Sequence, residues 1–182
     1  MSEFFRYNSA NENFVAARTF PGSDEKGAYF IRGSGHDQFG HYTENPPQYQ
    51  EVVDRLKKKH AASAAHVPAP VIERRDSARI GVITIGSCDL AVREALDQLA
   101  DAGVPADFLR VRGFPFVDEV RQFVDGHEIC FVVEQNRDAQ LRSLITIETG
   151  VSIEKMLPVL AYGGFPLSAQ HVVEAVLAKL EN

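Results

Sequence analysis

The chain has 182 residues, of which 45% are hydrophobic and 24% are charged, an ordinary balance for a globular protein with one sizeable core and an appendage. Its formal net charge is −6 and its one basic cluster is Lys57-Lys58-Lys59, so a nucleic-acid-binding surface is not expected. No apolar run reaches membrane-spanning length, and Met1-Ser2-Glu3 lacks the basic start of a signal peptide, so we expect no membrane partner and a cytoplasmic location.

The first 27 residues contain aromatic side chains but show neither a helical nor a strand period. Turn signals such as Pro21-Gly22 mark this segment as a long loop. A loop with so much apolar surface normally packs against another body. We therefore expect that a larger body is missing on the N-terminal side.

A short strand is expected over residues 28–32, and a glycine-rich loop follows it. Its glycines allow positive φ angles and a close approach to a ligand or a neighbouring chain. The candidates for a substrate or interface loop are Arg32, Gly33, Gly35, His36, Asp37 and His41. The spacing of the two histidines is not a zinc signature, so no metal is expected unless further ligands come from elsewhere.

Residues 49–60 predict a helix with a basic end, which complements the dipole of a helix C-terminus, and residues 61–65 could extend it. Val67-Pro68-Ala69-Pro70 then forms a stiff connector because proline cannot continue a helix. The expected domains are therefore residues 1–66 and residues 77–182.

The second region predicts strands that alternate with helices. Strands are expected at 80–85, 108–111 and 129–133, and helices at 90–102, 116–124, 139–147 and from a capping Ser168 to Leu180, with residues 151–160 ambiguous between strand and broken helix. This alternation indicates an α/β domain with a parallel sheet covered on both faces. Because ligands and partners gather at the carboxyl ends of parallel strands, the two turns after residues 85 and 133 should share one edge.

The sheet-edge candidates are Gly86, Ser87, Glu134, Gln135 and Asn136. Gly86 and Ser87 could bind phosphate at a helix N-terminus, but a plain turn with Ser87 or Asp89 as the helix cap is the simpler interpretation. Glu134 could act as a base or orient a partner, or it could satisfy backbone donors in the next loop. Cys88 and Cys130 offer no zinc or iron–sulfur set, and an inert Cys88 is favoured.

Several short motifs occur in order across nearly the whole chain, and together they resemble one family. They are Arg18-Thr19-Phe20-Pro21-Gly22, Arg32-Gly33-Ser34-Gly35-His36-Asp37, Asp54-Arg55-Leu56-Lys57-Lys58-Lys59, Gly86-Ser87 with Glu94-Ala95-Leu96, Arg112-Gly113-Phe114-Pro115-Phe116, and Val133-Glu134-Gln135-Asn136 with Gln140. The family is the alpha subunit of 2-oxoacid:ferredoxin oxidoreductases, especially the 2-oxoglutarate branch.

This resemblance implies oxidative decarboxylation of a 2-oxoacid on thiamine diphosphate, electron transfer through iron–sulfur clusters to ferredoxin, and release of an acyl-coenzyme A. It implies that residues 1–66 are the tail of a pyrimidine-type thiamine-enzyme domain with its connector, and that residues 77–182 form a domain like the C-terminal domain of transketolases. Thiamine diphosphate, Mg²⁺ and the nearest iron–sulfur cluster would belong to partner chains, with coenzyme A as co-substrate.

The family's gamma-like domain and most of its pyrimidine-type domain have no counterpart in these residues. The chain is therefore expected to be a C-terminal portion or split subunit that is inactive alone and assembles with a beta subunit and the remainder of the alpha subunit. Arg32 is the expected carboxylate contact, because a guanidinium can bind two oxygens at once. The alternatives are a free-standing α/β binding module for a phosphate-bearing ligand and a pure assembly domain without a ligand.

Overall fold

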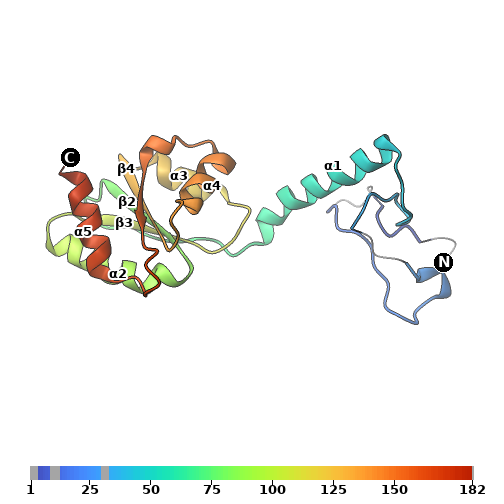
Figure 1. Cartoon of the computed structure of the whole chain (residues 1–182), viewed down its shortest axis with the longest axis horizontal. Helices are drawn as coiled ribbons and strands as arrows, with labels where there is room; N and C mark the ends of the chain where they lie inside the picture. Colours follow the sequence, from blue (N-terminus) through green and yellow to red (C-terminus); the bar gives the residue numbers. More distant parts are fainter. Residues whose placement is uncertain (1–3, 9–12, 30–32, 182) are drawn as a thin grey trace. The chain divides into compact units, whose positions relative to one another are not determined.

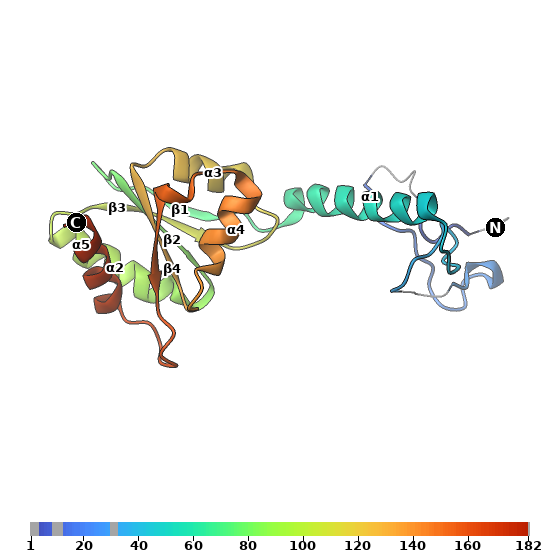
Figure 2. The same ribbon diagram turned by 45° about the horizontal axis from the view of Figure 1, so that its top comes forward.

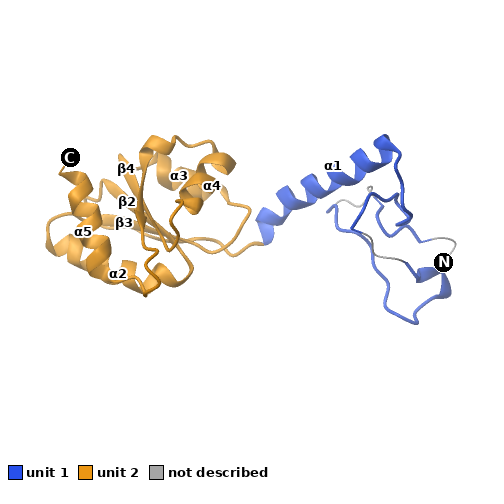
Figure 3. Ribbon diagram, in the orientation of Figure 1, with its two compact units in different colours: residues 1–66 blue, residues 67–182 orange. Residues whose placement is uncertain are grey.

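The computed structural model describes residues 4–8, 13–29 and 33–181. The chain divides into two compact units, residues 1–66 and residues 67–182, shown in different colours in Figure 3. Most of the strand expected over residues 28–32 lies outside the described residues, and so does Arg32. Each unit is described by itself below.

A five-stranded, mostly parallel sheet forms the centre of the second unit (Figure 1). Its strands are β1 (Val71–Glu73), β2 (Ile80–Ile85), β3 (Ala106–Val111), β4 (Ile129–Glu134) and β5 (Met156–Leu160). Their spatial order is β1-β3-β2-β4-β5, and only β1 runs antiparallel to its neighbour. From β2 the chain crosses to β3 on one side, and it then returns to β4 on the opposite side of β2. The strand order therefore reverses between β2 and β4.

Helices cover both faces of this sheet, as Figures 1 and 2 show. The helices are α2 (Asp89–Asp101), α3 (Asp118–Asp125), α4 (Gln140–Thr149) and α5 (Ala169–Leu180). On one face, Val82 of β2 packs in a cluster with residues of α2 and α5, whereas its neighbour Ile83 packs on the other face with residues of α3 and α4. Successive side chains of a strand point to opposite faces, so an unbroken apolar strand supplies both cores. The predicted α/β fold is confirmed.

Two segments of the second unit go beyond the prediction. No strand was expected at β1, which is short and follows the proline-rich connector ahead of residue 77. The ambiguous segment 151–160 contains a 3₁₀ turn, η4 (Ile153–Lys155), and then β5, which carries Pro158. Proline is tolerated there because β5 is an edge strand.

The first unit contains one long helix, α1 (Pro46–Ser63), and the short 3₁₀ turns η1 (Glu25–Gly27) and η2 (Ala64–His66). The helix begins three residues before the predicted start because the Asn45 side chain accepts a hydrogen bond from Gln48 N and prolines occupy the first helical positions. Across the described ranges of the chain, no helix combines the length and the apolar character that a bilayer crossing requires.

Candidate functional site

His36 of the glycine-rich loop is a packed residue. It is 7% exposed, and its ring lies on that of Tyr7 with the centroids 4.0 Å apart. Its Nδ1 lies 2.9 Å from the carbonyl oxygen of Asp37, and its backbone pairs with that of Tyr42. These contacts hold both edges of the loop and leave His36 little freedom to meet a ligand.

Asp37 shapes the turn that follows. Its Oδ1 accepts hydrogen bonds from the backbone N–H groups of Phe39 and His41, both at 2.9 Å, and Gly40 closes the turn with a φ of 92°. The imidazole of His41 lies 3.6 Å from Asp37 Oδ2 and is 78% exposed. Asp37 therefore acts as the internal brace of an aspartate-initiated turn, an arrangement that loops commonly use.

The two other glycine candidates differ in their surroundings. A Cβ at Gly35 would lie 2.8 Å from the Tyr49 ring and 2.9 Å from the Thr43 carbonyl oxygen, so the loop requires glycine there. A Cβ at Gly33 would meet nothing within 4 Å. Gly35 thus permits a close approach between the loop and α1 of the same chain, whereas the prediction concerned an approach to a ligand or a neighbouring chain.

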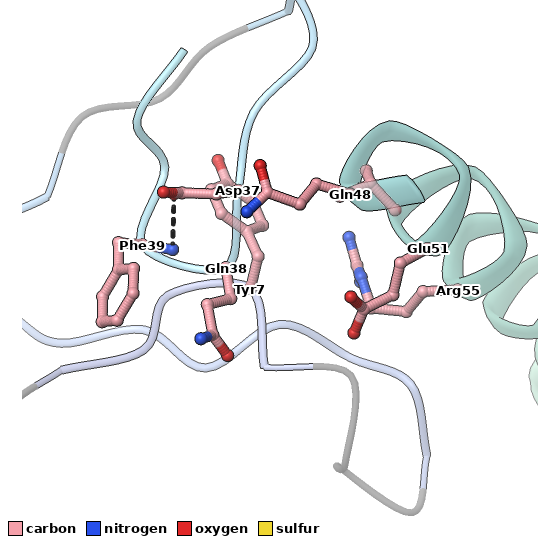
Figure 4. Close-up of a pocket in the computed structure, with 8 residues that line it drawn as sticks. Tyr7, Asp37, Gln38, Phe39, Gln48, Glu51 and Arg55 are labelled. Atoms are coloured by element: carbon pink, nitrogen blue, oxygen red, sulfur yellow. Dashed lines mark hydrogen bonds between the residues drawn. The ribbon is translucent and has the colours of Figure 1, made fainter. Parts of the chain in front are cut away.

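A cavity of about 110 Å³ lies between this loop and α1 (Figure 4). Its lining includes Tyr7, Asp37, Gln48, Glu51 and Arg55. A water molecule needs about 10–15 Å³ of such volume, so the cavity has room for several waters among polar and charged side chains.

Arg55 belongs to one of the family motifs but was not among the predicted site residues, and its side chain is only 5% exposed. Its Nη1 donates to the Phe14 carbonyl oxygen at 2.9 Å, while its buried Nε has no hydrogen-bond partner among the residues described. Burial lowers the pKa of Arg55. The available signal was its helical spacing from Val52, because residues three apart share one face of a helix.

At the carboxyl edge of the sheet, the turns after β2 and β4 meet as expected. Ser87 Oγ donates to Gln135 Oε1 at 2.9 Å and so joins the ends of the two strands between which the chain direction changes. Gly86, with a φ of 65°, opens the 3₁₀ turn η3 (Gly86–Cys88) that leads into α2. This hydrogen bond occupies the Ser87 hydroxyl.

The expected helix cap is wrong. Cys88 stands at the N-cap position of α2 without a side-chain hydrogen bond, and Asp89 instead accepts from Arg93 at 3.1 Å and from Arg110 at 3.0 Å. Cys88 is 2% exposed and burial raises the pKa of its thiol, which agrees with the inert interpretation.

Glu134 is 2% exposed and satisfies donors of the following loop and helix. Its carboxylate accepts from Leu141 N at 2.7 Å, Arg142 N at 3.2 Å and Asn136 Nδ2 at 2.5 Å. Asn136 Oδ1 accepts from the backbone N–H groups of Asp138 and Gln140. Glu134 and Asn136 therefore build the start of α4, and Gln135 is the member of this tripeptide that faces the edge.

An open crevice of about 720 Å³ lies beside Ser87 and Gln135. Its other walls include Leu90 of α2 and the loop that follows β5, in which Tyr162 and Phe165 are 65% and 84% exposed. No site residue was predicted in this loop, although Tyr162 and Phe165 on either side of Gly163-Gly164 were an available signal. Nowhere in the described part of the chain do three or more metal-ligating side chains gather.

No family model matches the chain. Over 84% of its length it is 31% identical to the alpha subunit of 2-oxoacid:ferredoxin oxidoreductase 2 from Aeropyrum pernix, and over 82% it is 26% identical to an alpha subunit from Saccharolobus solfataricus. These relatives confirm the resemblance to such alpha subunits. The chain spans about a quarter of their length, 24% in both cases.

Among solved structures, 2-oxoglutarate:ferredoxin oxidoreductase from Magnetococcus marinus, with 2-oxoglutarate, coenzyme A and succinyl-CoA bound, matches 99% of this chain. The TM-score is 0.86 at 22% identity, and the match covers 31% of that chain. A split-gene transketolase, an inactive β4 tetramer, matches 62% of this chain with a TM-score of 0.50 at 16% identity and covers 41% of its own chain. These likenesses support the fold.

Proposed function

We propose that this chain is the C-terminal portion of the alpha subunit of a 2-oxoacid:ferredoxin oxidoreductase, either as a split subunit or as part of a longer one. The observation that carries this proposal is the 31% identity to an alpha subunit over 84% of the chain but only 24% of the relative. We further propose that the chain is not active alone. It contributes to assembly and to the substrate and coenzyme A side of the reaction.

The substrate we propose is 2-oxoglutarate, because the solved enzyme whose chain matches 99% of these residues was found with 2-oxoglutarate and coenzyme A. The complex would include a beta subunit and the rest of the alpha subunit in the cytoplasm, and ferredoxin would accept the electrons. We assign thiamine diphosphate, Mg²⁺ and the iron–sulfur cluster to the partner chains, where thiamine supplies the electron sink for decarboxylation. The residues of this chain would position the substrate, hold the loops around it in place and exclude water.

Purification from the native cell tests this proposal. A tagged chain, purified gently, should bring the beta subunit and the remaining alpha-subunit sequence with it, identified by mass spectrometry. The material should be brown, because iron–sulfur clusters absorb visible light, and it should contain thiamine. A colourless, lone chain of 182 residues would contradict the natural-subunit proposal.

Within the complex, we propose that Arg32 contacts the substrate carboxylate and that the loop carrying it is held by His36 and Asp37. The hydrogen bonds of Asp37 and the packing of His36 support a bracing role for both. The phosphate-binding alternative gains no support from the edge, where the Ser87 hydroxyl already donates to Gln135.

Arg32→Ala in the assembled enzyme should raise the KM for the 2-oxoacid by about tenfold or more, since a charge-assisted contact to a carboxylate is lost. Steady-state kinetics measures this change, and Arg32→Lys should restore part of the affinity. Arg121→Ala is the matched control, because the Arg121 side chain is 61% exposed and pairs with Asp125 on α3. An unchanged substrate dependence in Arg32→Ala would remove the proposed role.

A further inference from the structure

We infer that His127 carries a proton on each ring nitrogen and forms, with Asp107 and Arg74, a charged clamp that holds β1 in the sheet and loosens as the pH rises. The three side chains lie within the second unit. This conformational device belongs to the fold and does not depend on the proposed function. We call the three residues the Asp107 clamp.

Both ring nitrogens of His127 face an acceptor. Its Nδ1 lies 2.6 Å from the Phe123 carbonyl oxygen, and its Nε2 lies 3.1 Å from Asp107 Oδ2. A carbonyl oxygen can only accept a hydrogen bond, and a neutral imidazole has one N–H group, so a neutral ring satisfies one of the two contacts. An imidazolium donates from both nitrogens and satisfies both.

Asp107 is an ionised acceptor at neutral pH. Burial by itself would raise the pKa of its carboxyl group, but hydrogen bonds from Arg74, Arg75 and His127 outweigh burial and lower the pKa. A carboxylate has no proton to donate to a bare imidazole nitrogen. The contact at Nε2 therefore places the proton on His127.

A neutral ring would have to use Nε2 as an acceptor for Arg74. Arg74 Nη1 lies 3.4 Å from Nε2 but only 2.6 Å from Asp107 Oδ2, so it is already engaged by the carboxylate. The lone pair of a bare Nε2 would also point at that carboxylate 3.1 Å away. The geometry therefore favours the imidazolium.

The surroundings of the ring stabilise a cation. Phe123 lies in the last turn of α3, where the free carbonyl groups carry negative partial charge. The His127 ring lies 4.4 Å from the Phe123 ring, centroid to centroid, and the Arg74 guanidinium lies 5.1 Å from the centroid of the same ring. One aromatic ring therefore contacts both cationic groups of the clamp.

The other ionisable groups described near the clamp are neutral or have partners. Cys130 on β4 is neutral, because burial raises the pKa of its thiol to about 12. Lys155 Nζ donates to the Asp125 carbonyl oxygen at 2.9 Å, and the Arg75 guanidinium binds a carboxylate of α2 at 2.6 Å. The carboxylates of Asp125 and Glu128 are more than half exposed and pair with arginines.

The clamp fastens the shortest strand of the described sheet. β1 has three residues, lies at the edge and runs antiparallel to β3, with which it forms three residue pairs. Arg74 and Arg75 follow it directly, and both donate to Asp107. Because β1 also follows the proline-rich connector, its release would lengthen the flexible segment between the two units.

Protonation of His127 sets the pH range in which β1 is held. A fold that favours the charged form of an imidazole gains stability from it at low pH and loses this contribution as the pH rises. The imidazole of an unfolded chain titrates at about 6.5. The clamp is therefore complete near pH 6, where Asp107 is still ionised, and is lost as the pH rises toward 9.

Nitrogen-15 NMR of the full chain tests the protonation state directly. We expect both ring nitrogens of His127 to carry protons at pH 7. His171 is the internal control, because among the described residues only its Nε2 faces an acceptor, the Leu160 carbonyl oxygen at 3.1 Å, and a neutral ring satisfies this contact. A bare nitrogen on His127 at pH 7 would overturn the inference, and this measurement needs no variant.

Hydrogen exchange of the full chain, followed by mass spectrometry, tests the consequence for β1. Protection of residues 71–76, expressed relative to the intrinsic exchange rate at each pH, should fall by about tenfold or more between pH 6 and pH 9. His127→Gln keeps an uncharged N–H donor toward Asp107, so in this variant protection should change by less than about twofold. The α5 peptide is the control for general loosening and should keep its protection in both chains. An equal pH dependence in the wild type and His127→Gln, or an equal loss in α5, would contradict the clamp.

Discussion

The carboxylate of Asp107 is buried at the beginning of β3 and ties this strand to the segment after β1. Arg74 Nη1 donates to its Oδ2 at 2.6 Å, Arg75 N donates to its Oδ1 at 2.7 Å, and His127 Nε2 lies 3.1 Å from Oδ2. Burial by itself would raise the pKa of Asp107, but the hydrogen bonds, led by that from Arg74, outweigh it and lower the pKa. A lowered pKa in the folded protein makes the ionised form a source of stability.

The change Asp107→Asn should lower the free energy of unfolding by about 1–3 kcal/mol at pH 7, because a buried charge-assisted network is broken. The stabilisation from ionised Asp107 is present above the unfolded-state pKa of about 3.9 and is lost as the pH falls through the lower folded-state pKa. Urea unfolding at pH 7, 5 and 3 should therefore show the wild-type advantage shrinking only at the acidic end.

Asp97→Asn is the control for this experiment. The Asp97 side chain is 74% exposed in its ion pair with Arg75, so its removal should cost less than about 1 kcal/mol at any of these pH values. A wild-type advantage over Asp107→Asn that stays constant down to pH 3 would contradict the account of the Asp107 carboxylate.

At the scale of elements, hydrophobic periodicity was enough to locate the main strands and helices. The stripe Val92, Ala95, Leu96 and Leu99 is wholly buried on α2, because a helix that covers a sheet must hide one face. Element starts were less predictable, because they depend on partners distant in sequence. Ser87 or Asp89 was expected to cap α2, yet the Ser87 hydroxyl donates to Gln135, 48 residues away.

Some parts of the candidate site could likewise be predicted from the sequence, and others could not. That Ser87 and Gln135 share an edge follows from parallel-strand topology and could be predicted. The cavity at Arg55 could not, because it depends on how the irregular segment around Tyr7 and Phe14 folds back onto α1, for which the sequence has no period. The aromatic loop was visible as Tyr162 and Phe165 in the sequence, but their exposure depends on the packing of α5 and β5.

The start of α4 depends on Glu134 in place of an ordinary cap. Ala139, at the N-cap position, has a φ of 50° and makes no side-chain hydrogen bond, while the Glu134 carboxylate receives the N–H groups of Leu141 and Arg142. Glu134→Ala leaves buried donors unsatisfied and should lower the free energy of unfolding by about 2–3 kcal/mol.

Urea unfolding measures this loss, and hydrogen exchange should show faster exchange at Leu141 and Arg142. Glu148→Ala on the exposed side of the same helix should change the free energy by no more than about 0.5 kcal/mol. If Glu134→Ala were as stable as Glu148→Ala, the proposed role of the buried Glu134 carboxylate in stabilising the start of α4 would be wrong.

At the scale of the whole molecule, the two units differ in the size of their hydrophobic cores. Both hydrophobic clusters, which run from Ile80 to Val176, lie inside residues 67–182. Among the described residues of the first unit, Tyr7 is the single buried hydrophobic side chain, and α1 exposes Val53 and Leu56. The described residues of the first unit therefore do not form a hydrophobic core of the kind that stabilises an independent domain.

This difference predicts the behaviour of each unit when it is produced alone. Residues 67–182 should unfold in urea in one cooperative transition, because their two clusters are complete without the first unit. Residues 1–66 should show no cooperative transition and only partial helicity by circular dichroism, because an isolated helix the length of α1 is marginal in water. Limited proteolysis of the full chain should accordingly cut within residues 1–66 first and leave a fragment that begins near Val67. A cooperative transition in residues 1–66 would contradict the conclusion that the first unit lacks a core of its own. A loss of cooperativity in residues 67–182 would mean that the second unit depends on the first for its stability.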